Sequence, residues 1–136
     1  MERTAPPLLR DPVTIGLLVY GAYSLALGLV MLLAPGWFFH NVGPFGTRND
    51  HYTRDNAAMY LAFGIVGLAA LRRPSWRVPV LAVWTVQAAI HAINHLGDIG
   101  NAHPKRDGPI DFALIAFSAA VLGWLTWRAA RSGPAD

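Results

Sequence analysis

Four long stretches of this chain are almost free of charged side chains, and each is long enough to cross a lipid bilayer as a helix. The clearest covers residues 13–34 and contains no charged residue at all. About 20 helical residues cross the hydrocarbon core of a bilayer. Three similar stretches cover about residues 51–71, 77–96 and 109–128. We therefore expect an all-α fold, a four-helix transmembrane bundle with up-down topology, in one integral membrane domain over residues 1–136.

The composition favours lipid over water as the surroundings of these helices. Hydrophobic residues make up 54% of the 136 residues and charged residues 14%. A soluble domain of this size has too little interior to hide so many apolar side chains. There is no cysteine, which excludes disulfides, thiolate metal sites and cysteine nucleophiles. The net charge of +3 belongs to arginines that flank the apolar stretches, so we expect no nucleic-acid partner.

Helix start signals precede the four stretches. Asp and Ser side chains accept hydrogen bonds from the first free backbone amides of a helix. Pro35 directly after the first stretch predicts the end of that helix. Pro79 is expected in the first turn of the third helix, where its missing amide costs no hydrogen bond. The residues expected to mark the four helix starts are Asp11, Asp50, Ser75 and Asp107.

The distribution of basic residues predicts how the bundle is oriented. Lysine and arginine are in excess on the cytoplasmic side of membrane proteins. One side of the expected bundle carries seven basic residues and the other carries four. We therefore expect both termini in the cytoplasm and all five histidines toward the outer leaflet. The seven residues are Arg3, Arg10, Arg72, Arg73, Arg77, Arg128 and Arg131.

A weak internal similarity links the first two stretches. LALGLVMLLA at residues 25–34 resembles LAFGIVGLAA at residues 61–70, at an offset of 36 residues. Because these helices would run in opposite directions, the similarity is compatible with an inverted repeat. Shared membrane composition is the simpler explanation. Small residues that would let helix backbones approach closely are Ser24, Gly28, Gly64 and Gly67.

Polar residues follow one face of the third stretch. At about 100° per residue they fall within an arc of roughly 100°. Polar groups that face lipid cost a few kcal/mol each, so we expect this face to point into the bundle and to line a pocket open to the outer side. The five residues are Gln87, His91, Asn94, His95 and Asp98.

Histidine spacing on this face predicts a metal site. Two imidazoles at positions i and i+4 can bind one ion, with carboxylates completing the shell. Imidazole favours zinc or copper over magnesium. His51 and Asp55, also four residues apart, start the second helix at the same expected depth. The predicted ligands are His91, His95, Asp98, Asp55 and His51, and Gln87 and Asn94 are predicted to contact a bound cofactor.

The same residues also have a structural interpretation. Histidines near the end of a span are often hydrogen-bonded groups of the membrane interface, and Asp55 could pair with Arg54. His40 and His103 lie in expected loops, where we predict solvated side chains. The tyrosines of the spans could donate hydrogen bonds into the pocket or only pack.

Several segments together resemble a known family. The runs LALGLVMLLAPGWFF and HYTRDNAAMYLAFG, and a third stretch ending in HAINH, resemble the DoxX-like group of small bacterial four-span membrane proteins. The similarity extends from about Leu25 to Leu96. It implies a multi-pass protein of the bacterial inner (cytoplasmic) membrane, connected with membrane redox complexes and quinone chemistry. It assigns no catalytic residue, and the HxxxH spacing is not taken from the family.

Three functions follow from these observations. The first is a membrane protein that binds a metal ion at the histidine pair. The second is an accessory or assembly subunit of a membrane redox complex, with no chemistry of its own. The third is a quinone or haem pocket; haem would need a partner such as His51, because His91 and His95 project from one face. Acid–base catalysis with His91 as base also stays open, so the sequence leaves enzyme activity undecided. Expected partners are the lipid bilayer and either a homo-oligomer or a larger membrane complex.

Overall fold

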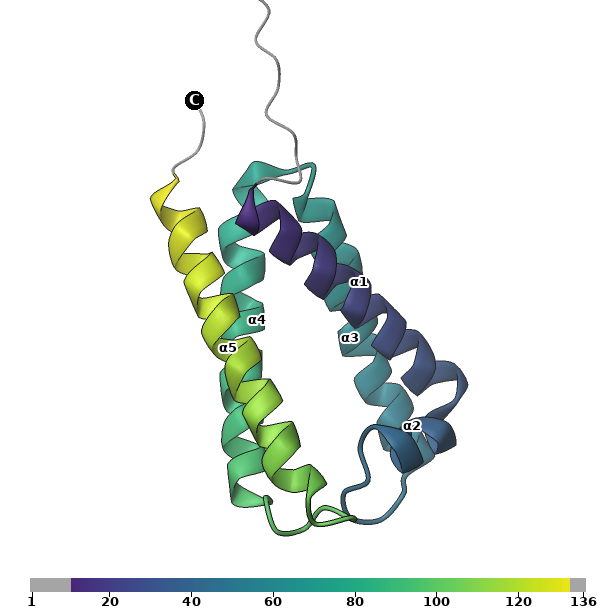
Figure 1. Ribbon diagram of the computed structural model, residues 1–136. Coiled ribbons are helices and arrows are strands. Elements are labelled where there is room, and N and C mark those ends of the chain that lie inside the picture. Colours follow the sequence, from purple (N-terminus) through teal and green to yellow (C-terminus); the bar gives the residue numbers. More distant parts are fainter. Residues whose placement is uncertain (1–10, 133–136) are drawn as a thin grey trace, which may run out of the picture.

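The computed structural model describes residues 11–132, and these residues form five helices and no strand. Four long helices run alternately up and down, and a short helix lies at the end of the first (Figure 1). The all-α prediction is therefore confirmed, and each predicted stretch corresponds to one long helix. The short helix was not predicted. The helices are α1 (Pro12–Leu33), α2 (Pro35–Asn41), α3 (Asp50–Ala70), α4 (Pro74–Gly97) and α5 (Asp107–Arg131).

The starts of α1 and α3 lie close to their predicted positions. Asp11 caps α1, and its carboxylate accepts hydrogen bonds from the amides of Val13 and Thr14 at 3.2 and 3.1 Å. The cap of α3 is Asn49 rather than Asp50, and its side chain accepts from the Tyr52 amide at 3.0 Å. Both caps satisfy amides that have no partner inside the helix.

The starts of α4 and α5 differ from the prediction. Helix α4 begins at Pro74, so Ser75 is not its cap and Pro79 lies inside the helix. Proline fits the first position of a helix, since its ring fixes φ near the helical value and no amide is needed there. Helix α5 begins at Asp107 itself, which is therefore a first-turn residue. The predicted caps Ser75 and Asp107 were wrong for this reason.

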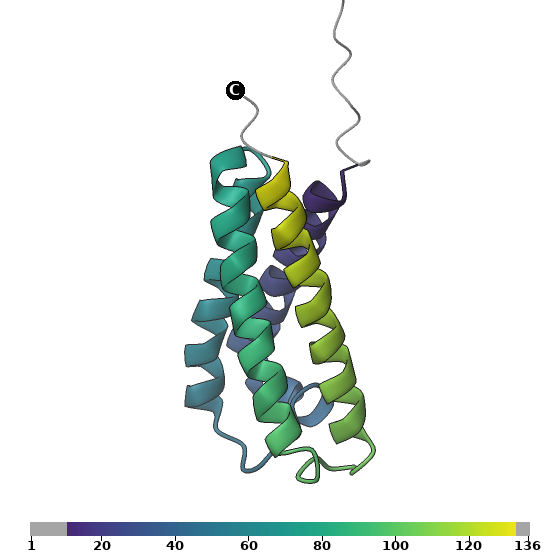
Figure 2. The same ribbon diagram turned by 90° about the vertical axis from the view of Figure 1, so that its left-hand side faces the viewer.

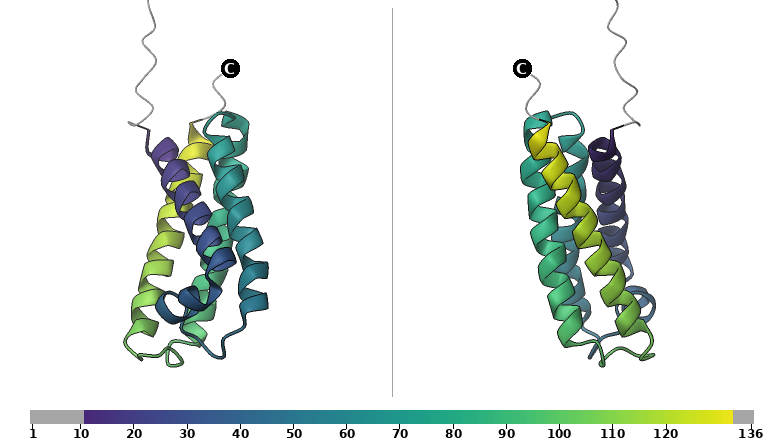
Figure 3. Two further views of the ribbon diagram at one scale, coloured as in Figure 1. Left: turned by 90° about the vertical axis from the view of Figure 1, so that its right-hand side faces the viewer. Right: turned by 60° about the vertical axis from the view of Figure 1, so that its left-hand side comes forward.

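Helices α1 and α3 pack with their backbones in near contact. A Cβ atom added to Gly28 would lie 2.9 Å from the backbone nitrogen of Leu61, and one added to Gly64 would lie 2.8 Å from that of Leu25. Gly67 is buried in the same helix. The prediction that small residues allow close approach of helix backbones is confirmed for Gly28 and Gly64. Figures 2 and 3 show the long helices side by side along their length.

Helices α4 and α5 form a second pair. Ala88 and Ala92 are buried on α4. The hydroxyl groups of Thr85 and Thr126 lie 2.9 Å apart and join the two helices. Each hydroxyl also bonds the carbonyl one turn earlier in its own helix, at 2.7 and 2.8 Å.

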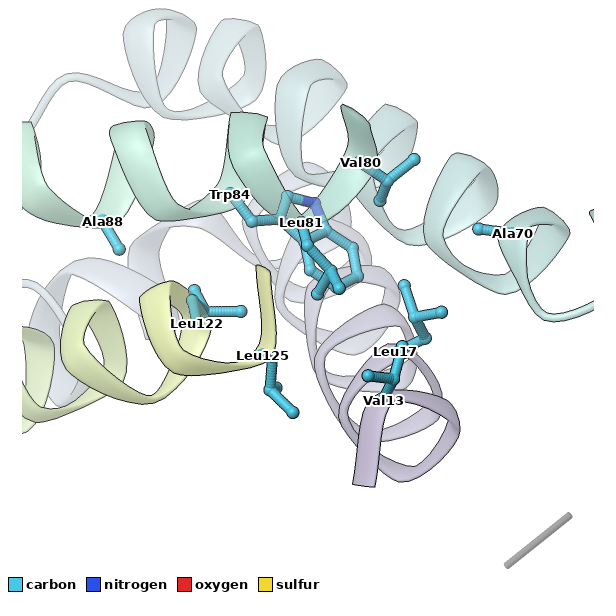
Figure 4. Packing of buried hydrophobic residues seen from close by; sticks show 9 residues of the cluster. All are labelled: Val13, Leu17, Ala70, Val80, Leu81, Trp84, Ala88, Leu122 and Leu125. Atoms are coloured by element: carbon cyan, nitrogen blue, oxygen red, sulfur yellow. The ribbon is translucent and has the colours of Figure 1, made fainter. Parts of the chain in front are cut away.

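The two pairs share a core at the end of the bundle where α1 starts and α3 ends. Trp84 is 4% exposed and packs near Tyr20, with ring centroids 6.0 Å apart. Beside this core, Arg77 of α4 lies 3.4 Å from the Asp11 carboxylate, which joins the starts of α1 and α4. Figure 4 shows the cluster, formed by Val13, Leu17, Ala70, Val80, Leu81, Trp84, Ala88, Leu122 and Leu125.

Two of the described helices, α1 and α5, are long and apolar enough to cross a membrane by length and composition. Their most apolar windows of 18 residues have mean hydropathies of 2.0 and 1.7. Of the α5 window only 11% is buried, against 33% for α1. Helix α5 therefore presents most of its apolar surface outward. Arg3 and Arg10, counted above for the orientation, lie outside the described residues.

Candidate polar site between the helix pairs

The polar face of α4 turns only partly into the bundle. Gln87, His91 and His95 are partly buried, whereas Asn94 and Asp98 are exposed. The buried face of α4 is centred on Trp84, Ala88 and Ala92, roughly 60–80° around the helix from the middle of the polar arc. This rotation places the small side chains of Ala88 and Ala92 inside the bundle. The polar residues therefore follow the border of the buried face.

His91 and His95 lie against each other. Their ring centroids are 4.6 Å apart and the ring planes stand at 82°, an edge-to-face arrangement. The ring of Phe45 packs edge-on against His95 from the other side, with centroids 4.9 Å apart. Among the described residues the buried Nδ1 of His95 has no hydrogen-bond partner. A buried polar atom without a partner is costly, so this nitrogen is a position where a bound ligand would lower the free energy.

The connection between α2 and α3 holds Phe45 in this place. Phe45 pairs with Ala102 of the α4–α5 connection in a single antiparallel bridge. Gly46, the next residue, has a φ of 64°, a value that glycine adopts without strain. The two loops at this end of the bundle are thus joined above the histidine pair.

Arg48 anchors the same connection. Its Nε and Nη2 donate to the two carboxylate oxygens of Asp50 at 2.6 and 2.7 Å. The hydrogen bonds and charge of Arg48 hold the pKa of the Asp50 carboxyl below its ordinary value of 3.8. The guanidinium also fills the space beside Gly36 of α2, where a Cβ atom would crowd it. This contact links α2 to the start of α3.

Helix α5 contributes an acid to the site. Asp111 is partly buried in the neighbourhood of His95 but forms no ion pair or hydrogen bond with it. Gly108 lets α5 start near this point, because any side chain there would overlap the carbonyl oxygen of Ile99. Asp111 was not among the predicted ligands. Its signal in the sequence was its isolation, because it is the single acidic residue between positions 108 and 127.

Tyrosines from the other helix pair extend the polar groups toward the middle of the bundle. Tyr60 of α3 lies in the neighbourhood of the Gln87 side chain and of Tyr23 of α1. The Tyr20 hydroxyl donates to the carbonyl of Ser118 on α5 at 3.5 Å. Polar groups of all four long helices therefore meet along the boundary between the two pairs. We call the set Tyr60, Gln87, His91, His95 and Asp111 the polar seam.

The other predicted ligands lie elsewhere. His51 and Asp55 contact each other at 3.4 Å on the outside of α3, with side chains 88% and 64% exposed. Asp98 accepts a hydrogen bond from Asn101 at 2.9 Å. Asp98 and His103 line an open hollow of about 470 Å³ between the loops, with Phe45 as the wall toward His95. His40 bonds the carbonyl of Gly36 at 2.8 Å through Nδ1.

The described residues hold no group of three or more histidine or acidic side chains already arranged around one point. Of the five predicted ligands, only His91 and His95 therefore lie together, and Asp111 lies in the neighbourhood of His95. The pair can donate and accept hydrogen bonds, accept protons or bind an ion through two nitrogens.

No family model, no curated protein and no solved structure matches this chain. The similarity to the DoxX-like group stays a hypothesis that depends on the quoted segments.

Proposed function

We propose that this chain is a small four-span membrane protein that binds a transition-metal ion, zinc or copper, at the His91–His95 pair near the outer leaflet. The observation that carries the proposal is this imidazole pair, partly buried, with a free buried nitrogen at His95 and a carboxylate nearby.

The exposed surface of the bundle supports a membrane location. Large apolar side chains are exposed along every long helix, including Leu33 at 76%, Ile93 at 67% and Phe117 at 69%. Soluble monomers rarely expose contiguous apolar patches above a few hundred Å². Lipid would cover such a surface without a further protein partner.

The positions of the charged residues support the same location. Between residues 12 and 47 there is none, and α3, α4 and α5 have charge-free stretches at 56–71, 78–97 and 112–127. At 1.5 Å per residue these stretches measure roughly 24–30 Å, close to the thickness of the hydrocarbon core. Charges therefore lie at the two ends of the bundle and not along its middle.

The two ends differ in charge, which supports the orientation. The end with the α3–α4 turn carries Arg72, Arg73, Arg77, Arg128 and Arg131 against Asp11, a net charge of +4 among the described residues. The histidine end carries four basic and five acidic residues, a net charge of −1. Three arginines of the first end lie over tryptophan rings, at 4.4–5.6 Å from the centroids. Arginine and tryptophan together are typical of a cytoplasmic interface.

The chemistry of the polar seam supports an ion held by few protein ligands. Neutral imidazoles bind zinc and copper, and a site with an open position takes its remaining ligand from water or substrate. Asp111 would have to turn toward the ion to become a third ligand. Metal-bound histidines commonly use their other ring nitrogen for a hydrogen bond that fixes the ring, and Asp111 would also have to move closer to His95 to accept one.

Metal analysis of the untagged protein tests this proposal. After treatment with a chelator and dialysis against zinc or copper, we expect about one equivalent of metal in the wild type, since one pair of imidazoles can hold one ion. The His91→Ala/His95→Ala variant is expected to lose it. The matched control is His51→Ala/Asp55→Ala, which removes a pair at the same spacing from the exposed side of α3.

The comparison of these variants decides the result. Wild-type metal content no higher than that of the His91→Ala/His95→Ala variant would end the proposal. Equal losses in both double variants would show that metal binds without preference for the partly buried pair.

A second function is favoured by helix α5. Only 11% of the most apolar 18-residue segment of α5 is buried, so the helix has a long exposed apolar face. A second helical subunit would fit such a face in the bilayer, as an accessory subunit of a membrane complex or a homo-oligomer requires. Such a role is compatible with the metal site and does not depend on it.

A further inference from the structure

A groove lies between α3 and α4 on the outer surface of the bundle, close to the turn that joins them. It has a volume of about 420 Å³ and almost no polar lining. Helices α3 and α4 meet at this end of the molecule (Figure 1). The walls are formed by Ala62, Phe63 and Val66 of α3 and by Trp76, Pro79 and Val83 of α4.

Trp84 forms the floor of the groove. Gly67 lies directly under its ring, and any side chain at that position would overlap the indole. The ring therefore lies deep between the helices, on the side of α1, and belongs to the core (Figure 4). Because the Trp84 ring lies deep in the core, a groove remains between α3 and α4 at the surface.

Arginine stands at the end of the groove that is nearest the α3–α4 turn. The Arg73 guanidinium lies 4.5 Å from the ring centroid of Trp76, and Trp76 is itself a wall of the groove. Arg72 is exposed beside it. Within residues 11–132 neither arginine has a carboxylate partner. Two successive cations without counter-charge thus lie in the turn beside one end of an apolar groove, and Arg73 contacts its wall.

We propose that this groove binds an anionic phospholipid of the leaflet at the basic end, with one acyl chain along the groove and the phosphate at Arg72 and Arg73. Residues 76–84 of α4 cover roughly 12 Å along the helix. One leaflet contributes about half of the roughly 30 Å hydrocarbon core, so the groove has the depth of one acyl region.

The selectivity for an anionic lipid follows from charge. Each basic residue near the membrane surface strengthens the attraction of an anionic headgroup by about fivefold in affinity. The cation–π contact with Trp76 holds Arg73 at the level of the headgroups. The inference depends on the proposed membrane location, but not on the proposed metal site.

Native mass spectrometry of the full chain, purified in mild detergent with equal amounts of phosphatidylglycerol and phosphatidylcholine, tests the proposal. We expect retained phosphatidylglycerol to exceed phosphatidylcholine by at least fivefold in the wild type. The Arg72→Gln/Arg73→Gln variant is expected to bring the ratio close to one. The control Arg128→Gln/Arg131→Gln removes two arginines of the same end that lie over Trp124 and Trp127 and not at the groove, and it is expected to keep the preference.

A second variant tests the groove itself. Ala62 is exposed on its wall, so Ala62→Phe would fill the groove without disturbing the core, and we expect it to lower retention of both lipids. Equal retention of the two lipids by the wild type, or equal effects of the two arginine pairs, would overturn the proposal. Resistance of the protein to alkaline extraction from membranes tests the membrane location separately, so a failure of that premise is recognised on its own.

Discussion

Asp11 shows how one side chain can serve both a helix and the tertiary structure. Its carboxylate accepts from the amides of Val13 and Thr14 and from the Thr14 hydroxyl, the last at 2.8 Å. It also faces Arg77 of α4 at 3.4 Å. Burial alone would raise the pKa of the Asp11 carboxyl, but the Thr14 and Val13 hydrogen bonds and the Arg77 charge together hold it below its ordinary value of 3.8.

This environment predicts a dependence of stability on pH. Because the folded state lowers the pKa of Asp11, its stabilising effect is fully present above pH 3.8 and is lost as the pH falls through the folded-state pKa. Asp11→Ala is expected to lower the free energy of unfolding by about 0.5–2 kcal/mol at neutral pH, through loss of the cap. Asp11→Asn keeps a capping oxygen without the charge. Thermal unfolding in detergent at several pH values should show a weaker acid dependence for Asp11→Asn than for the wild type; identical profiles would contradict the prediction.

Two pairs of side chains with the same sequence spacing differ because of their surroundings. His91 and His95 are partly buried beside Phe45, whereas His51 and Asp55 project from the outside of α3. Spacing on a helix brings both pairs into contact. Packing decides which of them has a restricted environment and a nitrogen without a partner.

At the scale of the elements, α1 and α3 pack through two equivalent contacts. Gly28 faces the backbone of Leu61, and Gly64 faces the backbone of Leu25. Gly64 lies 36 residues after Gly28, and Leu61 lies 36 residues after Leu25. This separation is also the offset of the internal similarity between residues 25–34 and 61–70. The similar segments therefore pack against each other in an antiparallel and reciprocal way. This geometry is what an inverted repeat would produce, although it requires only glycines at matching positions.

The reciprocal contact predicts similar effects of matching substitutions. Gly28→Ala and Gly64→Ala each place a Cβ atom under 3.0 Å from a facing backbone nitrogen, so each is expected to cost about 1–3 kcal/mol of stability. The double variant should cost less than the sum, because separation of the helices by one substitution makes room for the other. Unfolding of the purified protein, followed by circular dichroism, measures these differences.

Gly123 of α5 supplies the control for these substitutions. A Cβ atom there would lie 3.6 Å from Thr85, an ordinary contact. Gly123→Ala is therefore expected to be neutral or to stabilise by up to about 1 kcal/mol through helix propensity. If all three single variants behaved alike, close packing of α1 on α3 would not be important for stability.

The whole molecule has charged ends and a charge-free middle. The net charges of +4 and −1 at the two ends of the described bundle favour the arginine-rich end in the cytoplasm. Thr47 lies in an exposed loop at the histidine end, and Ser132 is exposed at the other. In the proposed orientation these two positions lie on opposite sides of the membrane.

Single cysteines at these positions test the orientation without background, because the chain has no cysteine. With a membrane-impermeant maleimide on spheroplasts, we expect Thr47→Cys to be labelled directly and Ser132→Cys only after the membrane is permeabilised. The reverse pattern would contradict the orientation. Labelling of both positions in intact spheroplasts would contradict a location in the membrane.

The sequence by itself determined the helices. The charge-free stretches predicted all four long helices, and the position of Asp11 at the start of α1 was predicted correctly. Caps, prolines and apolar runs act within a few residues, so their effects can be predicted without knowledge of the fold. The local signals failed for α4, where Pro74 and not Ser75 lies at the start, and for α2, a short helix that no local pattern predicted.

Only the tertiary structure decided which side chains meet. The rotation of α4 in the bundle buries Trp84, Ala88 and Ala92, and it leaves Asn94 and Asp98 exposed while His91 and His95 are partly buried. Phe45 contacts His95 from a loop distant in sequence, and Asp111 of α5 lies in the same neighbourhood. The sequence pattern of a helix gives the angular position of each residue around the axis of that helix. How that axis is turned toward its neighbours is a property of packing between helices, which no single segment contains.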